Sequence, residues 1–293
     1  MPAPIQPSSL LSLAAEVVGC YQALPQVEAV AVGGSLGSGV IDAESDIDLY
    51  VYVRSEIPIP VRAAIASARS KRAEVDNHFW EVGDEWVEAD TGVSVDVILR
   101  DAPWIEEQLD RVLRRHEASV GYSTCLWYNI LFSRVLVDRS GWFQALQLFA
   151  AQPYPEPLRQ AILAKNHPLL RQTISSYAHQ LDKAIGRGDL VSVNHRIAAL
   201  LASYFDVLFA LNRLPHPGEK RLVEAAVTRC ALIPKRLSEQ VAALIGAAGK
   251  ADQDLLVQVH ALVDGLDHLL QAEGFLPWLD EPDQFGQMGN WIE

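Results

Sequence analysis

Short apolar runs alternate with helix-like patterns over roughly the first 145 residues. Helical spacing of apolar residues predicts helices at about 8–23, 61–70 and 102–116. Runs typical of strands lie at 27–32, 47–53, 73–80, 84–90 and 93–99, with a last short one at 135–137. Strands with intervening helices predict an α/β domain, built on a mixed β-sheet with flanking helices, over residues 1–145.

The pattern changes after Gly141. Strand-like runs disappear, and Pro153, Pro155 and Pro157 indicate a linker. We expect an all-α helical bundle domain over 150–275, followed by an acidic tail over 276–293. The helices of this bundle are expected at about 157–186, 190–213, 219–230, 235–247 and 253–272.

Candidate chemistry is concentrated around a glycine-rich turn. A glycine-rich stretch over 33–39 separates the first two apolar runs, and Asp46 and Asp48 stand at the start of the second run. Residues i and i+2 of a strand point to the same face, so the two carboxylates are expected to project together. Carboxylates hold Mg²⁺ and glycine loops hold phosphates, so the stretch predicts a metal–nucleotide site.

A third carboxylate strengthens that prediction. Asp96 lies at the centre of the apolar run 93–99, where an acidic side chain is costly to bury unless it is paired or binds metal. A strand aspartate that faces solvent is the alternative. Three carboxylates on adjacent strands would hold two metal ions about 3.5–4 Å apart, as in in-line phosphoryl transfer.

These residues together resemble a known signature. Gly34-Ser35, ten intervening residues and then Asp46-Ile47-Asp48 are similar to the motif of the DNA polymerase β-type nucleotidyltransferase superfamily. Asp96 falls where that superfamily has its third catalytic carboxylate. The helical second half is similar to the layout of small antibiotic nucleotidyltransferases that act on aminoglycosides and lincosamides.

The resemblance implies a role for each residue. Asp46, Asp48 and Asp96 would be catalytic and would ligate Mg²⁺, with two ions expected. Gly34 and Ser35 would approach the phosphates of a bound NTP, since glycine lets the backbone come close and the serine hydroxyl donates a hydrogen bond. Asp96 is either a metal ligand or a general base, and Glu88 and Asp90 are alternative bases.

Charge is unevenly distributed along the chain. The net charge is −13, which argues against a long nucleic acid as partner. Residues 1–140 carry 11 basic and 21 acidic side chains, whereas 156–250 carry 13 basic and 7 acidic ones. An acidic metal-binding half and a basic half suit a metal–triphosphate, although ordinary surface variation explains the same numbers.

Cations from the helical half are candidate phosphate ligands. We expect Lys220 to bind nucleotide, with Arg221 beside it in the first turn of the helix at 219–230. A solvated turn is the alternative. Lys183, Asn194, His195 and Arg196 form a second candidate set.

Little in the chain predicts a membrane or disulfide-rich protein. No apolar run approaches the roughly 18 residues that span a bilayer, and the N-terminus carries Glu16 without a basic region. Cys20, Cys125 and Cys230 are far apart and predict no disulfide framework. We therefore expect a cytoplasmic monomer or homodimer.

The predicted activity is transfer of a nucleoside monophosphate from an NTP to a hydroxyl of a small-molecule acceptor, with release of pyrophosphate. Two alternatives keep the same site: a protein-modifying AMP transferase similar to an antitoxin, and a non-catalytic nucleotide-binding module. A kinase is less favoured, because the chain has no His-Arg-Asp or Asp-Phe-Gly motif.

Overall fold

A computed structural model describes residues 7–34, 46–79 and 81–275. The chain divides into two compact units, which are described separately below. The sheet unit comprises Met1–Arg115 and Leu126–Pro153, and the helical unit comprises His116–Cys125 and Tyr154–Glu293. The short segment 116–125 thus belongs to the helical unit although it lies between two parts of the sheet unit.

The sheet unit is built on one six-stranded mixed sheet in the order β3-β4-β5-β2-β1-β6. The central strands β2 and β5 are parallel, and the other four neighbouring pairs are antiparallel. This arrangement confirms the predicted mixed sheet. Its strands are β1 (Val27–Val32), β2 (Ile47–Val53), β3 (Ser70–Asn77), β4 (Gly83–Glu88), β5 (Ser94–Asp101) and β6 (Arg134–Asp138).

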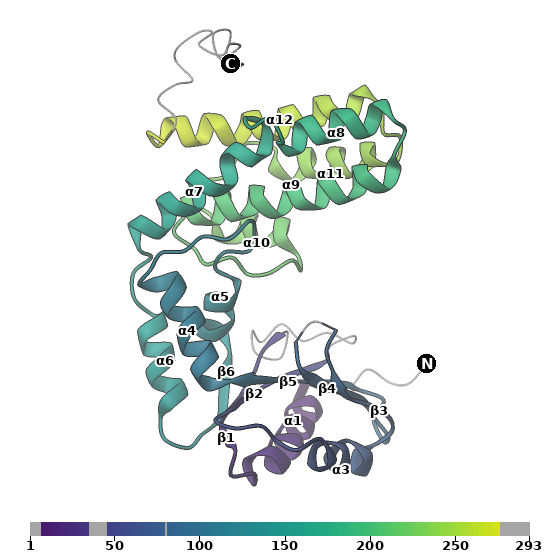
Figure 1. The fold of residues 1–293 in the computed structure, drawn as a ribbon, viewed down its shortest axis with the longest axis vertical. Coiled ribbons are helices and arrows are strands. Elements are labelled where there is room, and N and C mark those ends of the chain that lie inside the picture. The colour runs from purple at the N-terminus through teal and green to yellow at the C-terminus, as the bar shows by residue number, and fades with distance from the viewer. Residues whose placement is uncertain (1–6, 35–45, 80, 276–293) are drawn as a thin grey trace, which may run out of the picture. The chain divides into compact units, whose positions relative to one another are not determined.

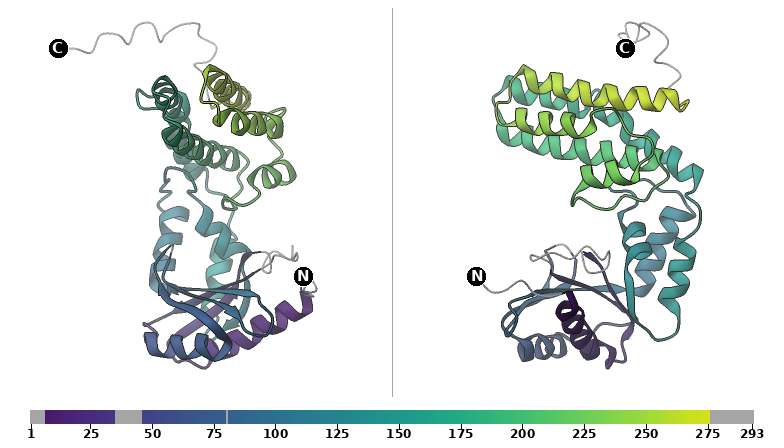
Figure 2. Two further views of the ribbon diagram at one scale, coloured as in Figure 1. Left: turned by 90° about the vertical axis from the view of Figure 1, so that its right-hand side faces the viewer. Right: turned by 180° about the vertical axis from the view of Figure 1, so that it is seen from behind.

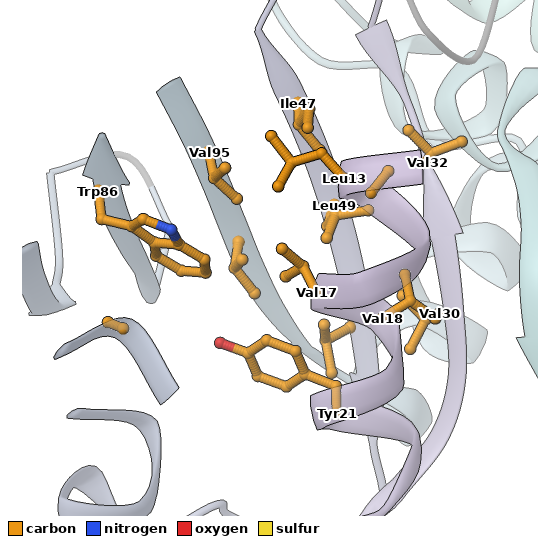
Figure 3. Packing of buried hydrophobic residues seen from close by; sticks show 14 of the residues in the cluster. Leu13, Val17, Val18, Tyr21, Val30, Val32, Ile47, Leu49, Trp86 and Val95 are labelled. Atoms are coloured by element: carbon orange, nitrogen blue, oxygen red, sulfur yellow. The ribbon is translucent and has the colours of Figure 1, made fainter. Parts of the chain in front are cut away.

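Two helices cover one face of this sheet. They are α1 (Pro7–Gln22) and α3 (Ile59–Arg69), which lie on the same side in all three ribbon views (Figures 1 and 2). Apolar side chains of α1 pack onto alternate residues of the central strands, because successive strand residues point to opposite faces. Figure 3 shows this core, in which Val17 and Tyr21 of α1 lie on the same side of the sheet as Leu49 of β2 and Trp86 of β4.

The opposite face of the sheet is partly covered by aromatic side chains near the C-terminal end of β2. Trp142 and Phe143 begin α6 (Trp142–Ala150), and their rings lie 5.5 and 4.7 Å from the ring of Tyr52. Helices α4 (Ala102–Leu113) and α5 (Cys125–Phe132) complete the unit. The sequence had indicated no helix at α6, although Phe143, Leu146 and Ala150 are buried at helical spacing.

The helical unit confirms the expected all-α second half. Its helices are α7 (Glu156–Arg171), α8 (Tyr177–Gly186), α9 (Leu190–Leu211), α10 (Leu222–Arg229), α11 (Leu237–Ala248) and α12 (Gln253–Ala272). The prediction of one helix over 157–186 was wrong. A break over 172–176 separates α7 from α8, because the Ser176 hydroxyl accepts a hydrogen bond from the His179 N–H and starts a new helix.

A buried aspartate ties the segment 116–125 to the helical unit. The Ser123 N–H and hydroxyl donate to the Asp206 carboxylate at 3.1 and 2.6 Å, and Asn166 Nδ2 donates to it at 3.2 Å. The Gly121 N–H donates to Asn166 Oδ1 at 2.8 Å. Burial raises the pKa of Asp206 to about 7, since a charged carboxylate is costly away from water.

Among the described residues, no helix is both long enough and apolar enough to cross a membrane.

Candidate functional site

Two of the three predicted carboxylates lie side by side on the central strands. Asp48 of β2 is paired in register with Asp96 of β5. Their strand neighbours Ile47, Leu49 and Val95 are fully buried on the side of α1, so both aspartates project from the opposite face. The parallel pairing of β2 and β5 therefore brings together two carboxylates that are 48 residues apart in the sequence.

Glu85, an acidic residue of β4, extends this pair into a row of three carboxylates. Glu85 of β4 is paired in register with Asp96, so the carboxylates of Asp48, Asp96 and Glu85 stand next to one another across three strands. Side chains directly opposite in a sheet have Cβ atoms about 4.5–5.5 Å apart. The sequence interpretation missed Glu85. The alternation around buried Trp86 could have placed it on this face, but its pairing with Asp96 depends on the strand register.

Asp96 stands at the centre of the acidic row, where burial and neighbouring negative charges both raise its pKa. The pKa of Asp96 is raised from 3.8 to about 6, first by burial and then by the charge of Asp48. Glu85, Asp46 and Glu81 raise this pKa further. Asp46 immediately precedes β2, and its effect on Asp96 indicates that it lies near the row.

The glycine turn approaches this row closely. The Gly33 N–H donates to the Asp48 carbonyl oxygen at 3.0 Å. Gly34 has φ +55°, and a Cβ added to it would lie 1.9 Å from Asp48 Oδ2. The site thus requires glycine both for its backbone conformation and for the space beside the carboxylate. Ser35, Ser38 and Ser45 lie outside the described residues, as does the rest of 35–45.

The buried side chains of Tyr50 and Arg100 form a stack that packs against the glycine turn. A Cβ on Gly33 would lie 2.4 Å from the ring of Tyr50, so the turn rests directly on this ring. The Arg100 guanidinium lies 4.1 Å from the centroid of the same ring. Arg100 also donates two hydrogen bonds to Glu81, at 2.9 and 2.7 Å. The stack holds the turn and β2 in a fixed relation.

The alternative bases do not join the row. Glu88 is buried on the helix-covered face of β4, where it accepts hydrogen bonds from Trp86 Nε1 at 2.9 Å and from Arg69 Nε at 2.7 Å. It thus points away from Asp96 and holds α3 against the sheet. Asp90 is exposed beyond the end of β4.

The cationic candidates lie in the helical unit. Lys220 is exposed and precedes α10, which begins at Leu222, so its predicted place inside the first helical turn was wrong. Arg221 adopts φ +53° at the N-cap, which ends any helical continuation towards Lys220. Asn194, His195 and Arg196 are exposed on α9, and Lys183 is exposed on α8. Nucleotide binding by Lys220 stays a prediction.

The donor set of the row suits a hard divalent cation. Mg²⁺ is bound through one or two carboxylates together with substrate phosphates. Asp48 and Asp96 offer two adjacent carboxylates, and the Gly34 backbone leaves room beside one of them. Within the described ranges, no group of three or more His, Cys, Asp or Glu side chains could hold a metal ion. Asp48 and Asp96 are two carboxylates, the number with which Mg²⁺ is bound when substrate phosphates supply further ligands.

No family model matches the chain, and no curated protein matches it. Among solved structures, the chain is similar to a nucleotidyltransferase-like protein from Exiguobacterium sibiricum 255-15. The two share 14% identity and a TM-score of 0.41, over 96% of this chain and 84% of that chain.

Two further solved structures have lower TM-scores. The STING-associated CdnE c-di-GMP synthase from Capnocytophaga granulosa shows 14% identity and a TM-score of 0.29, over 92% of this chain and 83% of that one. The CCA-adding enzyme from Thermotoga maritima, in complex with tRNA, shows 12% identity and a TM-score of 0.29, over 99% and 88%. Similarity this low carries no argument about substrate or mechanism.

Proposed function

We propose that this protein is a Mg²⁺-dependent nucleotidyltransferase that moves a nucleoside monophosphate from an NTP to a hydroxyl group of a small molecule. The observation that carries the proposal is the in-register pair Asp48 and Asp96 beside the backbone of Gly34. A carboxylate pair and a glycine turn at one strand end are what a metal–triphosphate needs.

Each part of the site has a proposed task. Asp46, Asp48 and Asp96 would hold Mg²⁺, which neutralises charge on the pyrophosphate leaving group when it is bound. The backbone at Gly34 would approach the phosphates, with Ser35 and Lys220 as further phosphate ligands. Glu85 extends the acidic row beyond Asp96 and raises the pKa of Asp96.

The acceptor oxygen attacks the α-phosphorus, and the bond to the bridging oxygen of pyrophosphate breaks. The acceptor proton must leave, and Asp96 is the candidate base among the three. Its raised pKa, about 6, brings it closer to neutral pH than an ordinary aspartate. As a metal ligand Asp96 would instead stay ionised, so the two roles are alternatives for this residue.

We propose a small hydroxylated acceptor, of the class represented by aminoglycosides and lincosamides. The net charge of −13 supports a small acceptor over a long nucleic acid, whose binding depends on Lys and Arg contacts to phosphates.

Calorimetric titration with ATP and Mg²⁺ tests the donor site. Wild type should bind, and Asp48→Asn should lose most of the binding heat. Asp90→Asn is the matched control, because Asp90 is exposed and lies outside the acidic row. Indistinguishable heats for wild type and Asp48→Asn would reject the proposed site.

A screen for pyrophosphate release tests the reaction and the acceptor. Each of the four NTPs is incubated with aminoglycosides, lincosamides, small alcohols, tRNA or no acceptor. Release that depends on a small alcohol or antibiotic supports the proposal. Release that needs tRNA, or that occurs with NTP alone, would replace the small acceptor with RNA or a second nucleotide.

A further inference from the structure

Tyr50 and Arg100 lie on the same face of the sheet as the acidic row, but both are buried. Tyr50 follows Asp48 by two residues on β2, so the two side chains share a face. Arg100 likewise follows Asp96 by four residues on β5. The exposed fractions of Tyr50 and Arg100 are 7% and 5%, whereas Gly34 in the turn is exposed. A ligand at the turn would therefore meet the backbone of Gly34 and not these two side chains.

The ring of Tyr50 limits where the backbone of Gly33 can lie. A Cβ added to Gly33 would lie 2.4 Å from Cε2 and 2.9 Å from the hydroxyl oxygen of Tyr50. The Gly33 N–H also donates to the Asp48 carbonyl oxygen at 3.0 Å. Gly34 follows directly and approaches Asp48 Oδ2. A shift of Gly33 would therefore change the space beside this carboxylate.

Arg100 fixes the ring in turn. It is paired in register with Tyr52, yet its guanidinium lies 4.1 Å from the centroid of the Tyr50 ring, so the two side chains lean towards each other along the strands. A cation over the face of an aromatic ring is attracted by it, and the attraction grows where water is excluded. Burial of both partners places this contact in the stronger range.

Glu81 sets the orientation of the guanidinium. It precedes β4 by two residues and accepts hydrogen bonds from Arg100 Nε at 2.9 Å and Nη2 at 2.7 Å. A planar guanidinium makes two such parallel bonds, and a lysine ammonium cannot reproduce this fork. The contact with Tyr50 thus depends on the shape of the arginine as well as on its charge.

We propose that Tyr50 and Arg100 are positioning residues of the nucleotide site. They hold the backbone of Gly33 and Gly34 at Asp48 in the geometry that receives the phosphates. Neither side chain touches the nucleotide, and both act through Gly33. The inference rests on the proposed function for the identity of the ligand.

Hydrogen exchange of backbone amides tests the positioning on the full chain without nucleotide or metal. In Tyr50→Leu and in Arg100→Met, the Gly33 N–H should exchange at least about fivefold faster than in wild type, relative to the other amides of β1. Tyr50→Phe keeps the ring and loses only the hydrogen bond of its hydroxyl with Asn129, so its effect should be about threefold or less. NMR of the assigned amides measures these rates.

Titration calorimetry with Mg–ATP tests whether the same contacts serve the nucleotide. Tyr50→Leu and Arg100→Met should each weaken binding at least about fivefold. Arg100→Lys retains the positive charge without the fork, so it should weaken binding nearly as much as Arg100→Met and should also speed exchange of the Gly33 N–H.

Arg69→Met is the matched control. Arg69 also donates to a buried glutamate of the sheet, Glu88 at 2.7 Å, but on the helix-covered face. This variant should keep wild-type exchange at Gly33 and wild-type affinity for Mg–ATP. Circular dichroism checks that each variant is folded, and Arg100→Lys keeps the test available where Tyr50→Leu does not fold.

Two results would overturn the proposal. One is unchanged exchange of the Gly33 N–H in both Tyr50→Leu and Arg100→Lys. The other is wild-type affinity for Mg–ATP in Arg100→Lys beside weakened affinity in Arg100→Met, which would mean that charge and not geometry is what Arg100 contributes. The exchange rates are measured without nucleotide, so a wild type that binds no Mg–ATP would reject the proposed function separately.

Discussion

Gly34 and Asp48 make the tightest contact of the candidate site. The glycine has no Cβ, and an added one would overlap Asp48 Oδ2. Beneath them Gly33 rests on Tyr50, which in turn stacks on Arg100. The geometry of the site therefore depends on two glycines, which have no side chain, as much as on the carboxylates.

Gly34→Ala should abolish nucleotide binding and lower stability. A left-handed φ costs a non-glycine residue about 1–2 kcal/mol, and the overlap with Asp48 adds to this cost. Gly92→Ala is the matched control, since Gly92 has φ +72° with nothing within 4 Å of an added Cβ. Urea unfolding should show a larger loss for Gly34→Ala, and equal losses would contradict the close contact.

Asp96 should make stability depend on pH in the absence of divalent metal. Its pKa rises from 3.8 to about 6 on folding, so between these values the folded protein binds more protons than the unfolded chain. Stability is therefore lost as pH rises through this window. Asp96→Asn should be more stable than wild type above pH 6, with the difference shrinking towards pH 4. Melting temperatures in EDTA from pH 4 to 8 measure this, and parallel profiles would refute it.

Strand register decides the site at the scale of elements. β2 and β5 run parallel, and their pairing sets Asp48 opposite Asp96. A slip of one residue would turn every side chain of a strand to the other face. The buried Ile47, Leu49 and Val95 prevent such a slip, because it would expose them. The apolar core thus fixes the carboxylate geometry on the other face.

Asp206, a buried side chain of α9, accepts hydrogen bonds from the segment 116–125. Asp206→Ala would remove the acceptor of the buried Ser123 N–H and one of the acceptors of the Ser123 hydroxyl and of Asn166 Nδ2, so we expect a loss of about 1–3 kcal/mol. Asp182→Ala is the control, since Asp182 is exposed on α8. Urea unfolding measures both variants, and a loss for Asp206→Ala no larger than for Asp182→Ala would show that this tie contributes nothing.

At the scale of the whole molecule, the chain combines an acidic sheet unit with a helical unit that carries most of its cations between 156 and 250. The proposed ligand, Mg²⁺ with an NTP, would bind the folded protein and not the unfolded chain. Its binding should therefore appear as a gain in global stability.

Mg–ATP at about 100 times its dissociation constant should stabilise the protein by about 2.7 kcal/mol. Thermal unfolding with ATP alone, with EDTA, and in Asp48→Asn should show little or none of this gain. A gain that persists in EDTA would show that the nucleotide binds without metal, contrary to the proposed site.

Much of the fold was predictable because its signals are local. The apolar runs at 27–32 and 47–53 match β1 and β2, and the helix expected at 253–272 matches α12. Two predictions failed although local signals were present. The cap at Ser176 separates α7 from α8, and the helical spacing of Phe143, Leu146 and Ala150 marks α6.

The candidate residues of the site are readable in the sequence: two aspartates at spacing i, i+2, a glycine turn before them and a third aspartate in a later strand. These are short-range patterns of side chains along a strand. Which of these residues meet depends on the pairing of strands in the folded sheet. The tertiary structure placed Asp48 beside Asp96, added Glu85 to the row and removed Glu88 from it, because pairing between strands depends on register and burial across the whole sheet.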